Sequence, residues 1–201
     1  MASMPWGVVL LMLIAVGLYF GLFQGALACW RLSLEGALIL LLVLIGADFV
    51  TLSIHTGSQT VQIHVGSILL VLLSCLLWFF QSGRHRPQWL WAGSICALLT
   101  GLLILAADRF WLGDWFQIYW ILPFLLGLTA AILTRNVAGL LWLTIFPMFI
   151  GQLFASLYWY LQNGFWLTVG SSQVFDMALL AAGFACLLVA AMQFFALRRM
   201  V

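Results

Sequence analysis

The residues of this chain that could do chemistry gather in one stretch, Gly46–Ser67, which holds one acid and two of the three histidines. Asp48, His55 and His64 lie there between long apolar runs. An aspartate beside a histidine can relay protons, bind a cation or hold a polar group, because burial and neighbouring charges shift the pKa of both side chains. Ionisable side chains in apolar segments are costly, so we treat these as candidate functional residues.

Composition indicates that lipid surrounds most of the chain. Of the 201 residues, 66% are hydrophobic and 6% are charged, whereas about a quarter of the residues in a soluble domain are charged. The net charge of +2 is too small to indicate a nucleic-acid partner. All seven basic residues other than histidine are arginine, so no lysine can form a Schiff base. We therefore predict an integral membrane protein whose main partner is the lipid bilayer.

Seven apolar segments, separated by polar, glycine or proline residues, are candidates for membrane-crossing helices. Their predicted bounds are about residues 6–29, 36–54, 61–80, 89–107, 115–134, 137–161 and 174–197. The predicted fold class is therefore all-α: a polytopic bundle of seven transmembrane helices in a single domain. In this interpretation the stretch 46–67 is the end of the second helix, a short polar turn and the start of the third.

The positions of the arginines predict the orientation of the bundle. When the loops are assigned alternately to the two sides of the membrane, one side receives only Arg109, which lies between Asp108 and Asp114. The other side receives Arg31, Arg84, Arg86, Arg135, Arg198 and Arg199. Because cytoplasmic loops carry the excess of basic residues, the N-terminus is predicted outside and the C-terminus in the cytoplasm.

Four polar side chains are predicted to converge in the outer leaflet. Asp48 would lie about two turns below the outer end of the second helix, roughly 9 Å deep, and His64 about one turn into the third, roughly 5 Å deep. Gln152 falls in the outer half of the sixth helix, and Asp176 in the first turn of the seventh. We therefore predict a pocket that binds a polar ligand or relays a proton.

Purely structural roles for the same residues are alternatives. A negative charge stabilises a helix N-terminus, which would account for Asp176 after two serines. His55 and His64 could lie in the lipid headgroup region. Asp48 could make an interhelical hydrogen bond that only fixes the packing.

A small-residue face on the first predicted helix offers a different function. Gly17, Gly21 and Gly25 repeat at intervals of four residues, so they form a groove that another helix can approach closely. That helix could belong to the same chain, to a membrane-protein partner or to a second copy.

Enzyme motifs such as HExxH, GxSxG, the P-loop and GxGxxG are absent from the sequence. Gly46-Ala47-Asp48 matches only part of the GxGD sequence of intramembrane aspartyl proteases. The four cysteines form no CxxC pair and lie in or beside apolar runs, where a free cysteine behaves as a small hydrophobe. We therefore predict no catalytic residue, no cofactor and no metal site.

Two short motifs resemble a known family. Gly170–Asp176 (GSSQVFD) opens the last helix, and His64–Ser67 (HVGS) lies where an Asn-x-Gly-Gly motif would stand. Together with the chain length and helix spacing, they resemble the YphA-like membrane proteins of spore-forming bacteria. The resemblance implies a multi-pass protein of the bacterial plasma membrane and a sporulation context, without a known activity.

Two functions follow from the sequence. The leading hypothesis is a small, non-enzymatic transporter or permeation component that uses the predicted pocket of Asp48, His64, Gln152 and Asp176. The alternative is a non-catalytic scaffold or assembly partner that docks through Gly17, Gly21 and Gly25.

Overall fold

The computed structural model describes residues 6–20, 33–56, 59–80, 86–110, 118–164 and 166–198. Helix accounts for 84% of them. The described residues form seven helices and three strands, and each helix overlaps one of the seven predicted segments. The helices are α1 (Trp6–Tyr19), α3 (Leu34–Asp48), α4 (Val65–Phe80), α5 (Arg86–Phe110), α6 (Ile118–Leu133), α7 (Val137–Asn163) and α8 (Ser172–Arg198); the strands are β1 (Thr51–Thr56), β2 (Gln59–His64) and β3 (Trp166–Val169).

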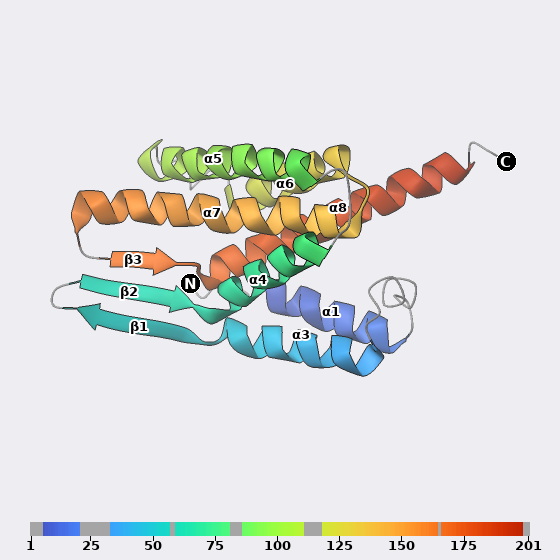
Figure 1. The fold of residues 1–201 in the computed structure, drawn as a ribbon, viewed down its shortest axis with the longest axis horizontal. Helices are drawn as coiled ribbons and strands as arrows, with labels where there is room; N and C mark the ends of the chain where they lie inside the picture. The colour runs from blue at the N-terminus through green and yellow to red at the C-terminus, as the bar shows by residue number, and fades with distance from the viewer. Residues whose placement is uncertain are drawn as a thin grey trace.

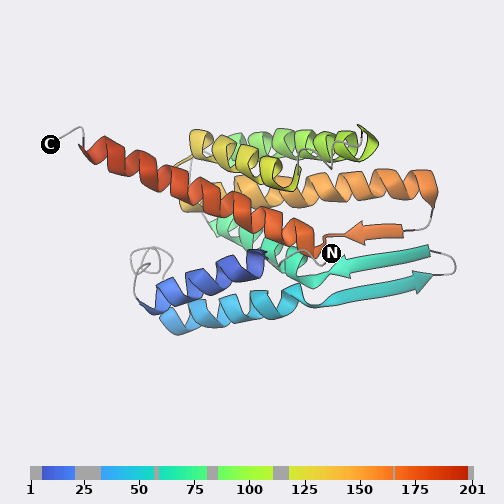
Figure 2. The same ribbon diagram turned by 180° about the vertical axis from the view of Figure 1, so that it is seen from behind.

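Helix α7 is the centre of the bundle. It contacts α4, α5, α6 and α8 along its length, and β3 packs beside its C-terminal half (Figure 1). Helices α1 and α3 pair with each other, and α1 also contacts α8. The small sheet lies at one end of the bundle, whereas α8 starts near the middle, where β3 ends, and runs past the opposite end (Figure 2). The bundle therefore has a sheet-bearing end and a purely helical end.

The bounds predicted for the second and third helices, 36–54 and 61–80, are wrong at the ends that face each other. Helix α3 stops at Asp48, α4 starts at Val65, and the residues between them form the β1–β2 hairpin. Polar and apolar residues alternate strictly from Thr51 to His55 and from Thr60 to His64. This alternation has the period of a strand and would scatter the apolar side chains around a helix. The all-α prediction therefore holds for the bundle and misses a three-stranded sheet.

The sheet has one polar and one apolar face. Strand β1 pairs antiparallel with β2, and β2 pairs parallel with β3, in the order β1-β2-β3. Since paired residues point to the same face, the register separates two sets of side chains. The mainly polar face carries Thr51, Ser53, His55, Thr60, Gln62, His64 and Thr168 together with Trp166. The mainly apolar face carries Leu52, Ile54, Val61, Ile63, Leu167 and Val169 together with Thr56 and Gln59.

Three helices are long and apolar enough to cross a membrane. They contain the segments Pro87–Ala107, Val137–Asn163 and Ser172–Gln193. Large apolar side chains stay exposed on the bundle surface, among them Leu98 and Leu102 on α5 and Leu187 on α8. Exposure of this kind is expected where the surrounding solvent is hydrocarbon. The structure thus supports a membrane protein. The prediction of seven membrane crossings includes four more helices than these three.

The core lies where α7 and α8 cross. Phe175 and Met148 are fully buried there, against Leu70 of α4 and Leu122 of α6. Phe175 is also the residue before Asp176, so the start of α8 is fixed by the largest packed cluster. This anchoring gives the sheet-bearing end a defined geometry.

The predicted helix-packing face is only partly described. Gly17 is buried in α1, whereas Gly21 and Gly25 lie outside the described residues. Docking of a partner through Gly17, Gly21 and Gly25 stays a prediction.

Candidate functional site

Three chain segments meet at the sheet-bearing end of the bundle: the C-terminus of α3, the end of β2 with the start of α4, and the start of α8. Gly66 lets α4 approach α3 closely, because a Cβ atom there would lie 2.8 Å from the Cα atom of Asp48. The segment before α8 closes the third side: a Cβ atom on Gly170 would lie 2.7 Å from the Cβ atom of Ser67. The two stretches that carry the family resemblance therefore pack directly against each other.

His64 connects the ends of two helices. Its Nε2 atom lies 2.8 Å from the carbonyl oxygen of Asp48, and a carbonyl only accepts, so Nε2 carries the proton. The backbone N–H of Ser67 donates to Nδ1 at 3.3 Å. Each helix end leaves such groups without an intrahelical partner. The neutral imidazole therefore satisfies a carbonyl at the end of α3 and an amide at the start of α4.

Ser67 carries the connection on to α8. Its hydroxyl donates to the carbonyl oxygen of Ser171 at 2.8 Å and lies 3.1 Å from Nδ1 of His64. The hydroxyl oxygen of Ser171 accepts from the backbone N–H of Val174 at 3.1 Å, which makes Ser171 the N-cap of α8. A continuous chain of contacts thus joins the ends of α3, α4 and α8.

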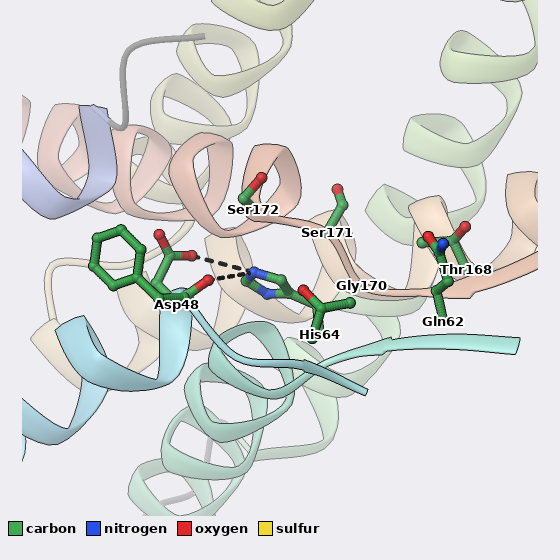
Figure 3. Close-up of a pocket in the computed structure, with 9 residues that line it drawn as sticks. Asp48, Gln62, His64, Thr168, Gly170, Ser171 and Ser172 are labelled. Atoms are coloured by element: carbon green, nitrogen blue, oxygen red, sulfur yellow. Dashed lines mark hydrogen bonds and ion pairs between the residues drawn. The ribbon is translucent and has the colours of Figure 1, made fainter. Parts of the chain in front are cut away.

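The carboxyl group of Asp48 is not satisfied by this network. Asp48 is only 6% exposed, and its Oδ1 atom is buried without a hydrogen-bond partner. The nearest cationic or titratable neighbour is Nε2 of His64 at 3.4 Å, whose proton already points to the Asp48 carbonyl (Figure 3). A buried acceptor without a donor is costly. The arrangement therefore leaves one strong acceptor without a donor in a residue that lines the neighbouring pocket.

A pocket of about 450 Å³ opens beside this carboxyl group. Its wall on one side is the polar face of the sheet, and the helix ends close the other sides (Figure 3). The lining residues are Asp48, Phe49, Thr51, Gln62, His64, Thr168, Gly170, Ser171 and Ser172. Most of these residues carry a hydroxyl, amide, carboxyl or imidazole group. The volume is within the usual range of small-molecule sites, about 300–1,000 Å³.

The structure places the four predicted pocket residues in different ways. Asp48 and His64 meet, but Asp48 is the last residue of α3 rather than two turns from its end, and His64 precedes α4 rather than lying inside it. Asp176 is buried, and its Oδ1 accepts the backbone N–H of Gly7 at 2.7 Å. Gln152 lies half-buried on α7. Neither Asp176 nor Gln152 is among the residues that line the pocket.

His55 lies away from this site. It is exposed on β1, and its Nδ1 atom lies 3.1 Å from the hydroxyl of Thr60 across the hairpin. The contact is a cross-strand pair on the polar face of the sheet. His55 therefore stabilises the hairpin and does not line the pocket.

Several lining residues were not predicted. Thr51 and Gln62 reach the pocket from the hairpin, Thr168 from β3, and Ser172 from the first turn of α8. Their sequence signal is the alternation of polar and apolar residues in the strands, which places every second side chain on one face. The contribution of β3 has no local signal, because β3 is far from the hairpin in sequence.

Metal ligation has no visible basis in the described part of the chain. No three His, Cys, Asp or Glu side chains lie close enough together there to hold a metal ion. Cys75, Cys96 and Cys186 are free thiols.

No protein-family model, curated protein or solved structure matches the chain.

We expect His64→Ala to lower the free energy of unfolding by about 2–5 kcal/mol, because the Asp48 carbonyl and the Ser67 amide each lose a buried partner. His64→Asn should cost about half as much, since asparagine is a favourable N-cap for α4 but is too short to reach Asp48. Thermal or chemical unfolding of the purified protein measures both variants. Equal losses for the two variants would contradict the role of His64 as a bridge between two helix ends.

Proposed function

We propose that the protein is a small polytopic membrane protein that binds a polar solute in the pocket beside Asp48 and His64 and moves it across the membrane. In this proposal all seven helices cross the bilayer, with the N-terminus outside and the C-terminus in the cytoplasm. The pocket then faces the extracytoplasmic side. The observation that carries the proposal is Asp48, which lines the pocket and whose buried Oδ1 atom lacks a hydrogen-bond partner.

The direction of the helices supports this orientation. The N-terminal ends of α3, α5 and α7 lie at the helical end of the bundle, away from the sheet (Figure 1). Arg86 opens α5, Arg135 lies in the turn before α7, and Arg198 ends α8, so these three basic residues share that end. Basic residues accumulate on the cytoplasmic side. The sheet and its pocket would then lie outside.

The length of α3 supports a recessed pocket. Its 15 residues rise about 22 Å, whereas the hydrocarbon core is about 30 Å thick. A helix that starts at the cytoplasmic boundary would therefore end roughly 8 Å below the outer boundary, at Asp48. Non-helical backbone at such a depth is tolerated where it lines a polar cavity. The hairpin would complete the crossing with its polar face toward the pocket.

Solute-driven currents across reconstituted vesicles test the proposed function. Purified protein in liposomes would be exposed to separate pulses of amines, carboxylates, amino acids, sugars and inorganic cations, with protein-free liposomes as the control. We expect at least one solute class to enter the vesicles, measured as uptake of the radiolabelled solute, as a current or as a pH change inside, in a way that protein-free liposomes lack. A flat response to every class would contradict transport and would leave the scaffold alternative.

A further inference from the structure

We propose that the pocket binds a small zwitterion that carries an N–H-bearing ammonium group and a carboxylate, as an amino acid does. The ammonium would lie at the C-terminal end of α3 beside Asp48, and the carboxylate at the N-terminal end of α8. The inference rests on the proposed function, because it specifies the class of solute that the same pocket accepts.

The α3 side of the pocket attracts positive charge. The last carbonyl groups of a helix carry the negative end of its dipole, and α3 ends at Asp48, which adds a carboxyl group at the same place. Asp48 is 6% exposed, and its Oδ1 has no hydrogen-bond partner. An ammonium group with N–H donors would satisfy this acceptor, whereas a quaternary ammonium has no hydrogen to donate.

The α8 side of the pocket attracts negative charge. Gly170, Ser171 and Ser172 line the pocket where α8 begins. Ser171 caps the amide of Val174, so the amides of Ser172 and Gln173 stay without an intrahelical partner. Backbone N–H groups and the positive end of the dipole make such a helix start a site for a carboxylate.

The two ends lie in one pocket, which is why a single-charge ligand fits less well. The backbone carbonyl oxygen of Asp48 accepts from His64, and the Ser67 hydroxyl donates to the carbonyl oxygen of Ser171, so these links keep α3 and α8 together. Among the residues that line the pocket there is no arginine, and the chain has no lysine. A carboxylate alone would meet Asp48 without a compensating cation, and an amine alone would leave the α8 amides unused. A zwitterion satisfies both ends.

The test is the thermal stability of the purified protein with matched probes. The zwitterions are L-alanine, β-alanine and γ-aminobutyrate, which differ in the distance between their charges. The single-charge probes are n-propylamine and propionate, and glycine betaine is a zwitterion without N–H donors. We expect at least one amino acid to raise the unfolding temperature by about 2 °C or more at millimolar concentration, and the other three probes to act less. An equal shift from propylamine, propionate or betaine, or no shift from any probe, would overturn the inference.

Two backbone-level variants test the α8 end. Ser172→Pro removes one amide donor, and proline is well tolerated at the first position of a helix. Ser172→Ala removes only the hydroxyl and is the matched control. We expect Ser172→Pro to weaken binding of the amino acid by about tenfold, with Ser172→Ala close to the wild type. Equal binding by Ser172→Pro and the wild type would contradict a carboxylate at the α8 end, even if Asp48 variants proved unstable.

The binding and transport experiments test the zwitterion site and the transport function separately. Currents from another solute class, without a shift from the amino acids, would overturn the zwitterion and leave transport standing. A shift from an amino acid that neither enters the liposomes nor produces a current would support the zwitterion site and contradict transport.

Discussion

Asp48→Asn is expected to abolish the solute-dependent current of the reconstituted protein at solute concentrations that drive the wild type. A hydrogen bond to a charged group contributes about 1.5–3 kcal/mol, so losing the carboxylate should weaken solute binding by about 10- to 100-fold. Asparagine keeps the shape of the side chain, and the backbone carbonyl that holds His64 is unchanged. The free energy of unfolding should therefore change by less than about 1 kcal/mol.

The comparison separates a binding role from a packing role for Asp48. Glu35→Gln is the matched control, because Glu35 is exposed in the first turn of α3, at the opposite end of the same helix. We expect it to keep the full current. If Asp48→Asn kept the current as well, or lost it only through unfolding, Asp48 would be a structural residue.

Gly170→Ala should be among the most destabilising single substitutions, lowering the free energy of unfolding by about 2–5 kcal/mol. Gly170 has a φ of 73°, which costs a residue with a Cβ atom about 1–2 kcal/mol. The added Cβ atom would also lie 2.7 Å from Ser67, and overpacking of this kind costs about 1–3 kcal/mol more. The strain falls on the Ser67–Ser171 link, so the pocket should open as the protein weakens.

Gly164 provides the control for this prediction. It ends α7 with a φ of 75°, and a Cβ atom there would meet nothing within 4 Å. Gly164→Ala should therefore cost only the conformational part, about 1–2 kcal/mol. Both variants can be compared by thermal unfolding in one detergent. Equal losses would show that the contact with Ser67 has no energetic weight.

The helices were predictable because long apolar runs leave few other structures in lipid. Each predicted segment corresponds to a helix, and Ser33 caps α3 through the amide of Gly36. Pairing of Asp48 with His64 was also predictable, since a short connection brings consecutive segments together. The sequence does not define the depth of the two residues, because depth depends on where each helix ends.

The hairpin was missed because the apolar residues within it were counted toward the flanking helices. Leu52 and Ile54 extend the second apolar run, and Val61 and Ile63 begin the third. A test for a period of two residues separates them, since Thr51, Ser53 and His55 alternate with them. The resulting polar face is what gives the pocket its wall.

Other parts of the site depend on tertiary packing. Strand β3 pairs with β2 although more than 100 residues of chain separate the two strands. The backbone N–H of Thr168 in β3 also donates to the hydroxyl of Ser156 on α7. Nothing near Thr168 in the sequence indicates that partner. Asp176 looked like a pocket residue, but it faces Gly7 of α1 instead. The partner of Asp176 depends on how α1 packs against α8, and the local sequence pattern does not reveal that packing.

Labelling of single cysteines tests the central claim that the pocket is a water-filled site on the extracytoplasmic side. Thr168→Cys lies in the pocket, and Arg135→Cys lies exposed at the helical end; both would be placed in a chain whose four native cysteines are replaced. We predict that a membrane-impermeant thiol reagent labels Thr168→Cys in intact cells and labels Arg135→Cys only after permeabilisation. The reverse pattern would contradict the orientation, and a Thr168→Cys that stays unlabelled even in permeabilised cells would contradict the pocket.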